Sequence, residues 1–234
     1  YNIKAIVLNR QPISEINIRA IVYSRELGKL ELTARGAKKI KSKSAGHLEP
    51  LNLVDIMVVR GRRHDYAGSA VSEKCYSNIK ADFAKLAAAG RAVRLANDLI
   101  KPGLADAEIF DLLKDYLEEL ENTKERTEFL LTFFSLKLLA RLGHYPEFFQ
   151  CLNCRVKIQS GKNRFDLARG GLVCPKCLNS KDANQLAISD NGIKLLRLVL
   201  TADFSELIKV KTENKLAGEI GEVRSSVLVY GSRR

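Results

Sequence analysis

The chain has 234 residues, of which 46% are hydrophobic and 28% are charged. This length permits two or three small folded units, each with a core of its own. Thirty-nine Lys and Arg against 27 Asp and Glu leave a formal net charge of +12, which favours nucleic acid as a partner, with an anionic membrane surface as the second choice. We find neither an apolar run of roughly 20 residues nor the order of a secretory signal, and therefore expect a cytoplasmic protein.

The first 75 or so residues are rich in strand-forming side chains. Five short runs of Val, Ile, Leu and Tyr, at 3–10, 17–26, 28–36, 52–61 and 65–74, are separated by turn residues and by one long basic loop. Five strands of this length suit a small closed barrel. We predict a first domain at residues 1–78.

From about residue 80 the apolar residues recur at helical spacing. The stretch 127–143 is apolar almost all round, which indicates the central helix of a bundle, ended by Gly143. Residues 189–210 predict one capped amphipathic helix, and residues 214–230 a weaker helix. We predict a helical domain at 79–234, interrupted by an insertion at 148–180.

The insertion contains two Cys-x-x-Cys pairs, Cys151 with Cys154 and Cys174 with Cys177. Nineteen residues separate the pairs, a spacing typical of four-cysteine zinc sites. Four thiolates close the coordination sphere, so the sequence predicts a structural zinc ion. A reducing cytoplasm disfavours a disulfide framework, and a thioredoxin-type redox pair would need a helix start within a βαβ unit.

Two further expectations concern this region and the remaining cysteine. Residues 155–158 and 164–167 are expected to pair as a hairpin that turns at Gly161. Cys75 has no partner pair and is expected to be a small buried apolar residue.

Basic residues gather in the predicted barrel. No acid lies between Glu31 and Glu49, and a second basic turn follows at residues 60–63. On a closed barrel these side chains would follow a phosphate backbone, with Tyr23 or Tyr66 stacking on bases; the alternative is an ordinary solvated charge run. The candidate nucleic-acid-binding residues are Arg10, Arg19, Arg25, Arg35, Lys38, Lys39, Lys41, Lys43, Arg60, Arg62 and Arg63.

We expect no enzymatic activity. The stretch "SGKN" at 160–163 lacks the first glycine of a P-loop and the Ser or Thr that follows its lysine. The three histidines have no catalytic partner at a recognised spacing, and the acids of 115–121 crowd one helix. A metal-dependent nuclease would instead need acids that converge from different elements.

The order of these parts resembles the RecO family of bacterial recombination mediators over nearly the whole chain. The resemblance rests on "TARGAKKIKSKSAGHLEPLNLVDI" at 33–56, on "CLNC" at 151–154 and on "FDLARGGLVCPKC" at 165–177. Two departures stand out: "QPISEIN" at 11–17 occupies a turn where the family usually has a glycine followed by an acid, and Arg155 replaces a common glycine.

The resemblance implies an α+β multidomain fold, with a five-stranded OB-fold barrel, an α-helical domain and an inserted zinc ribbon. It also implies a nucleoid-associated, DNA-binding mediator that anneals complementary strands, even when they are coated by single-stranded DNA-binding protein, and that helps load RecA together with RecR. Lys137 and Arg141 are candidates for the basic rim of a groove that holds the acidic tail of the single-strand binder. A zinc-ribbon protein that binds RNA or assists transcription is the alternative.

Overall fold

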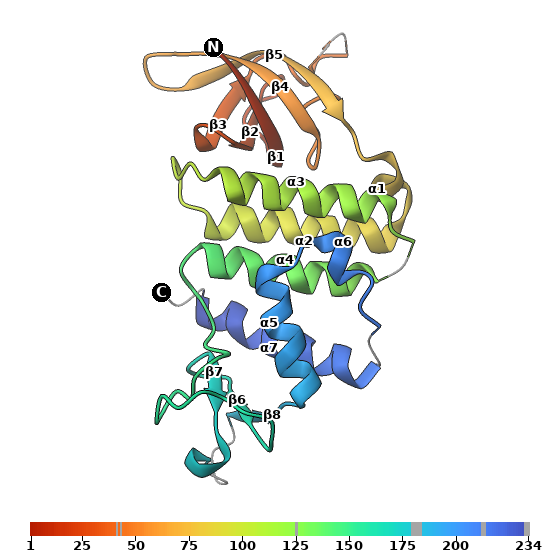
Figure 1. Ribbon diagram of the computed structural model, residues 1–234. Coiled ribbons are helices and arrows are strands. Elements are labelled where there is room, and N and C mark those ends of the chain that lie inside the picture. The colour runs from red at the N-terminus through yellow and green to blue at the C-terminus, as the bar shows by residue number, and fades with distance from the viewer. Residues whose placement is uncertain (41, 43, 125, 179–183, 212–213, 232–234) are drawn as a thin grey trace. The chain divides into compact units, whose positions relative to one another are not determined.

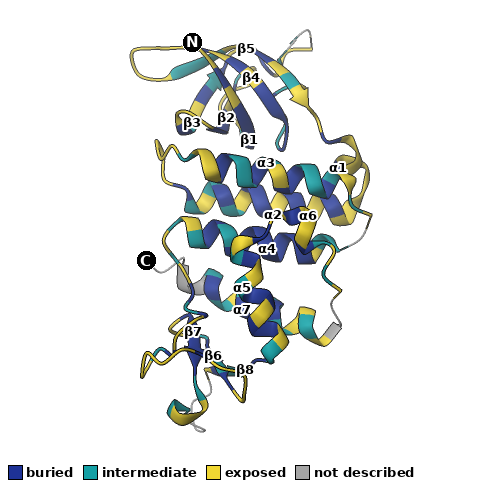
Figure 2. Cartoon of the chain, in the orientation of Figure 1, coloured by how far each residue is buried: buried dark blue, intermediate teal, exposed yellow. Residues whose placement is uncertain are grey.

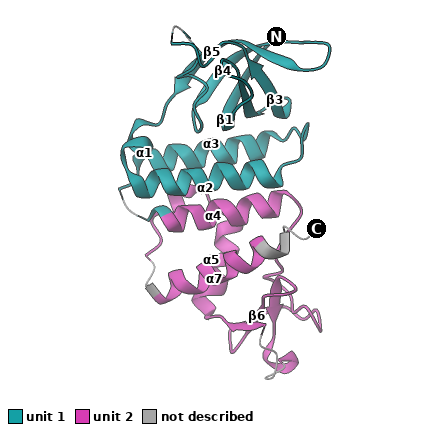
Figure 3. Cartoon of the chain, turned by 180° about the vertical axis from the view of Figure 1, so that it is seen from behind, with its two compact units in different colours: residues 1–127 teal, residues 128–234 magenta. Residues whose placement is uncertain are grey.

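A computed structural model describes the chain except for residues 41, 43, 125, 179–183, 212–213 and 232–234. The chain divides into two compact units, residues 1–127 and 128–234 (Figure 3). The first unit combines the strand-rich region with three helices. The predicted domain ranges, 1–78 and 79–234, assign α-helical residues from 79 onward to the second domain instead. These ranges stay a prediction.

The first unit begins with a closed five-stranded barrel (Figure 1). Its strands are β1 (Asn2–Pro12), β2 (Ile18–Ser24), β3 (Gly28–Ala34), β4 (Leu53–Val59) and β5 (Asp65–Lys74). Their order is β1-β2-β3-β5-β4, and only β3 and β5 pair in parallel. This five-stranded barrel confirms the predicted OB-fold.

The barrel closes around alternate residues of its strands. In β4, for example, Val54, Ile56 and Val58 are buried, whereas Asp55, Met57 and Val59 are exposed. Side chains alternate between the two faces of a strand, so this period of two places one apolar set inside the barrel. Leu48, from the long loop between β3 and β4, joins the same core.

Three helices follow in the first unit: α1 (Ser77–Ala81), α2 (Phe83–Leu99) and α3 (Ala107–Asn122). The side chain of Asp82 accepts a hydrogen bond from the backbone N–H of Lys85, and Asp106 accepts two from the first turn of α3. These aspartates satisfy backbone donors that have no partner within the helix, and so they define where α2 and α3 begin.

Gly28, at the start of β3, lies too close to the chain between α2 and α3 to tolerate a side chain. Its φ is +69°, and a Cβ atom built there would lie 2.1 Å from the carbonyl oxygen of Leu104. Gly28→Ala is therefore expected to lower the free energy of unfolding in urea by at least about 2 kcal/mol, from left-handed strain and steric overlap. Gly90→Ala is the matched control, because a Cβ at this position in α2 meets nothing within 4 Å and should stabilise the helix by about 0.5–1 kcal/mol. Equal stabilities for the two variants would contradict the placement of Gly28.

The second unit contains α4 (Thr127–Arg141), α5 (Asp190–Thr201), α6 (Phe204–Leu207) and α7 (Asn214–Gly231). As predicted, α4 is buried on nearly all sides (Figure 2) and ends just before Gly143. The prediction of one helix over 189–210 is wrong, because Ala202 is extended and separates α5 from α6. Asp203 and Glu206 form a capping box that begins α6.

The cysteine-bearing insertion is a small three-stranded ribbon of order β7-β6-β8. Its strands are β6 (Arg164–Asp166), β7 (Gly171–Val173) and β8 (Gln185–Ala187), and a 3₁₀ turn covers Pro175–Cys177. The predicted hairpin at Gly161 is wrong, because β6 pairs with β7 and turns through Gly170, at φ +68°. Among the described residues, no helix is long and apolar enough to cross a membrane.

Candidate metal centre and nucleic-acid interface

The four predicted cysteine ligands lie together at one end of the ribbon. Their sulfur atoms are all within 4.8 Å of one another, although Cys151 and Cys154 precede β6 and Cys174 and Cys177 follow β7. The Sγ atoms of Cys154 and Cys174 are 3.7 Å apart, close to the edge of about 3.8 Å of a tetrahedron with metal–sulfur bonds of about 2.3 Å. All four are free thiols. The cluster therefore fits one tetrahedral metal ion, as the spacing predicts.

The backbone around the first cysteine pair shapes this site. Arg155, which replaces the expected glycine, adopts a left-handed φ of +60° and donates its backbone N–H to the carbonyl oxygen of Cys151 at 2.9 Å. The turn therefore survives the substitution. Burial of the Cys151 thiol raises its pKa, but backbone N–H groups of Cys154, Cys174 and Asn153 outweigh that effect and lower the pKa to about 6. A thiolate at neutral pH favours cation binding.

A buried acid braces the cysteine turns. Asp166 is 2% exposed and accepts hydrogen bonds from the backbone and the guanidinium of Arg169, the latter at 2.8 Å. Arg169 in turn donates to Asn153 at 2.7 Å, and Asn153 donates to the carbonyl oxygen of Cys177 at 3.4 Å. This chain of hydrogen bonds was not predicted from the sequence. The one sign of it there is that Asp166 is the only acid between residues 148 and 178.

The prediction that Cys75 is buried is wrong. Cys75 is exposed in the segment that joins β5 to α1. The next residue, Tyr76, takes the interior position and is 4% exposed. Among the described residues, the four-cysteine cluster is therefore the one group with the ligand number and geometry of a metal centre.

The two basic segments of the barrel adjoin one another. Leu32 and Thr33 at the end of β3 pair with Asp65 and Tyr66 at the start of β5. The guanidinium of Arg35 lies 4.2 Å from the centroid of the Tyr66 ring. The basic loop that follows β3 therefore begins next to the point where the basic turn before β5 ends. That turn lies at the end of the barrel away from α2 and α3 (Figure 1).

The loop after β3 is also held against the turn between β1 and β2. The backbone N–H of Lys38 donates to the carbonyl oxygen of Ile16 at 3.0 Å, and its ammonium to that of Ser14 at 3.3 Å. On the other side, the guanidinium of Arg60 lies 5.5 Å from the centroid of the Tyr1 ring. The basic loop after β3 and the basic turn before β5 thus supply the cations at this end of the barrel, and the turn between β1 and β2 supports the loop.

Six predicted residues at this end are exposed and have no ion-pair partner among the residues that the structure describes. Two of them, Arg35 and Arg60, lie against the rings of Tyr66 and Tyr1. The other four are Lys38, Lys39, Arg62 and Arg63. Lys41 and Lys43 lie outside the described residues. Cations without a nearby carboxylate keep their full attraction for phosphate.

Three other predicted arginines are already paired with carboxylates. The pairs are Arg10 with Glu49, Arg19 with Glu31 at 3.6 Å, and Arg25 with Asp111 at 2.9 Å. The guanidinium of Arg25 donates hydrogen bonds to the carboxylate of Asp111, and this raises the pKa of Arg25. A paired guanidinium attracts a phosphate less strongly than an unpaired one. A DNA contact by these three arginines stays a prediction.

The expectation that Tyr23 stacks on bases is wrong. Its side chain is fully buried, and its hydroxyl donates to the carbonyl oxygen of Asp106 at 3.2 Å. Burial raises the pKa of Tyr23 to about 12. Tyr66 is half-buried, and the guanidinium of Arg35 lies over its ring. Little of the Tyr66 ring is therefore left for stacking on a base.

The two candidates for the binding of a protein tail lie near the end of α4. Lys137 is half-buried, and burial lowers its pKa; Arg141 is exposed in the last turn of the helix. Their role in partner binding stays a prediction.

Comparison with known proteins accounts for both units. The family described as "Recombination protein O N terminal" matches residues 1–70, and "Recombination protein O C terminal" matches residues 80–223. A DNA repair protein RecO of Dehalococcoides mccartyi (strain CBDB1) is 30% identical over 220 residues, which cover 94% of this chain and 86% of that protein. A DNA repair protein RecO of Desulforamulus reducens is 26% identical over 230 residues, covering 98% and 89%. Since these matches span the barrel, the helices and the cysteine ribbon, the chain belongs to the RecO family of DNA repair proteins.

Proposed function

We propose that the protein is a recombination mediator that binds DNA through its barrel and anneals complementary strands, including strands coated by single-stranded DNA-binding protein. The observation that carries this proposal is the cluster of exposed cations without ion-pair partners among the described residues: Lys38, Lys39, Arg62 and Arg63. Lysine and arginine contacts to phosphate hold a strand without reading its sequence, as a protein that pairs arbitrary strands requires.

Annealing in this proposal needs no catalytic residue and no ATP. The cationic end of the barrel holds one backbone and screens its repulsion of a second, while base pairing and the release of condensed counterions supply the free energy. The protein is therefore proposed to act by positioning strands, not as an enzyme. RecR would help it load RecA on the DNA, and the work would take place at the bacterial nucleoid.

We also propose that zinc is the ion of the cysteine cluster. The donor set of four thiolates suits zinc and leaves no open coordination position for water or substrate. Zinc bound there would hold the two cysteine turns together and thereby stabilise the ribbon. The tail of the single-strand binder would dock elsewhere, against the basic rim that Lys137 and Arg141 provide.

The proposal is tested by annealing two complementary labelled oligonucleotides, precoated with single-stranded DNA-binding protein, in the absence of nucleotide. The protein should accelerate pairing at about 50 mM salt and lose this effect towards about 200 mM, because each phosphate contact displaces counterions. Strands that stay unpaired, or faster pairing of RNA than of DNA, would overturn the mediator assignment in favour of RNA binding. Shortened strands in magnesium would instead indicate a nuclease.

A further inference from the structure

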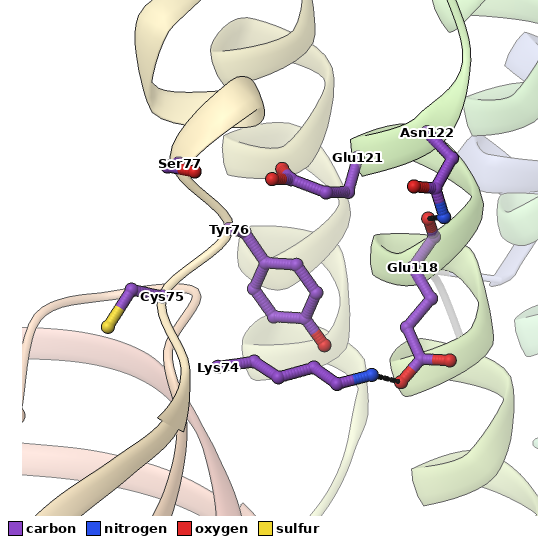
Figure 4. A pocket seen from close by; sticks show the side chains of 7 residues that line it. All are labelled: Lys74, Cys75, Tyr76, Ser77, Glu118, Glu121 and Asn122. Carbon is purple, nitrogen blue, oxygen red and sulfur yellow. Dashed lines mark hydrogen bonds and ion pairs between the residues drawn. The ribbon is translucent and has the colours of Figure 1, made fainter.

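A pocket outside the sites described above lies within the first unit, where β5 passes into α1 and faces the last turns of α3 (Figure 4). Its volume of about 340 Å³ lies at the lower end of the range of small-molecule and side-chain sites. The lining residues are Lys74, Cys75, Tyr76, Ser77, Glu118, Glu121 and Asn122.

Tyr76 gives this pocket an unsatisfied polar group. The residue is 4% exposed, and its hydroxyl has no hydrogen-bond partner among the described residues. Its backbone is left-handed, with φ of +48°. The hydroxyl points towards the end of the Lys74 side chain and the acidic side of the pocket (Figure 4). A buried hydroxyl without a partner is destabilising, and a ligand that donates a hydrogen bond would relieve the cost.

The opposite wall is acidic. Glu118 and Glu121 lie in the last turns of α3, where the structure has no basic residue in the final turn. The carboxyl end of a helix carries partial negative charge, so carboxylates there strengthen the negative potential. In a chain of net charge +12, this pocket is therefore a local site for a cation and disfavours DNA.

Each carboxylate already has a partner but retains room for another. Glu118 pairs with Lys74 at 2.5 Å and with Lys114, one turn earlier in α3, at 3.7 Å. Glu121 accepts the backbone N–H groups of Asn78 and Ile79, each at 2.9 Å. A carboxylate offers about four lone-pair sites, so both can accept further donors.

We propose that this pocket binds the guanidinium group of an arginine side chain presented by a partner protein. A guanidinium carries five donors in one plane, which matches acceptors on two facing walls: the Tyr76 hydroxyl, Glu118 and Glu121. A compact ammonium has fewer donors and reaches fewer of them at once. A metal ion fits less well, because among the described residues only the four ribbon cysteines bring ligand atoms close enough together.

Lys74 acts as an internal competitor for this ligand. Its side chain is 44% exposed, so it can leave Glu118 for water when a guanidinium arrives. Removing the Lys74 charge should therefore raise the affinity for arginine, whereas removing the Glu118 charge should lower it. A purely structural role for these residues predicts no such opposite pair of effects.

The test titrates the full chain with acetyl-Gly-Arg-Gly-amide and, separately, with the same peptide carrying neutral citrulline, followed by NMR or calorimetry. The arginine peptide should bind and the citrulline peptide should not. Glu118→Gln should weaken binding by about threefold to tenfold, and Lys74→Met should strengthen it by a similar factor. Tyr76→Phe should weaken binding without lowering the melting temperature, because it removes a hydroxyl that has no hydrogen-bond partner among the described residues.

Glu119→Gln is the matched control, because it removes the same charge from α3 outside the pocket. Equal binding of the two peptides, no binding of either, or weaker binding by Lys74→Met would each overturn the proposal. So would an effect of Glu119→Gln as large as that of Glu118→Gln. The readout involves no DNA, so its result is independent of the annealing experiment.

Discussion

Charge reversal of the cationic end of the barrel is expected to abolish DNA binding at moderate salt while leaving the fold intact. In the variant, Lys38, Lys39, Arg62 and Arg63 are all replaced by Glu. These side chains are exposed and have no ion-pair partner among the described residues, so their replacement disturbs no internal contact of that kind. Affinity for single-stranded DNA should fall by at least about a hundredfold, and the slope of log affinity against log salt should lose about three units. Fluorescence anisotropy across a salt series measures both quantities.

The control for this experiment carries the same change in charge elsewhere. Replacing the exposed residues Lys101, Lys194, Lys209 and Lys211 by Glu also removes eight units of charge, so both variants fall from +12 to +4. A general electrostatic attraction would weaken equally in both. Equal losses would show that net charge, and not this end of the barrel, holds the DNA. Unchanged affinity in the barrel variant would contradict the proposal that these four residues bind DNA.

Replacing two cysteines of the cluster is expected to lower the melting temperature more than any other change proposed for this protein. Cys174→Ser with Cys177→Ser should reduce bound metal from one equivalent to nearly none. Metal binding by small four-ligand sites contributes about 10–16 kcal/mol to the folding of isolated zinc-finger peptides. The ribbon strands cover only three residues each, so they have little other means of staying folded. Metal analysis and scanning calorimetry should show loss of the ion and a lower melting temperature.

Cys75→Ser is the matched control, because Cys75 is exposed and lies outside the cluster. Its metal content and melting temperature should equal those of the unchanged protein. A strong chelator added to the unchanged protein should reproduce the effect of the double substitution. Full metal content with an unaltered melting temperature in that double variant would contradict a four-cysteine site.

The sequence predicted the strands and the ligand set well because both depend on local patterns. Alternating apolar residues define β1 to β5 within a few residues of the predicted runs. Two residues between cysteines let both thiols point to one ion, so the pairs could be recognised without knowing how they meet. The resemblance to the RecO family could be recognised from the segments at 33–56 and 165–177.

Local patterns were less informative where short segments compete. The region 189–210 has continuous helical periodicity, yet the capping box of Asp203 and Glu206 restarts the helix after an extended Ala202. In the ribbon, β6 pairs with β7 instead of forming the expected hairpin at Gly161. Short strands contribute little free energy individually, and in the observed ribbon β6 has two partners, β7 and β8, where the expected hairpin would give it one.

The sequence by itself therefore determined the barrel, the helical body, the set of four clustered cysteines and the excess of positive charge. Only the tertiary structure decided which of the cations are neutralised and which tyrosine is accessible. Arg25 is paired with Asp111, 86 residues away, and Tyr23 is buried with its hydroxyl on the backbone of Asp106. The free energy of such contacts depends on separation in space, whereas periodicity and ligand spacing record only separation along the chain.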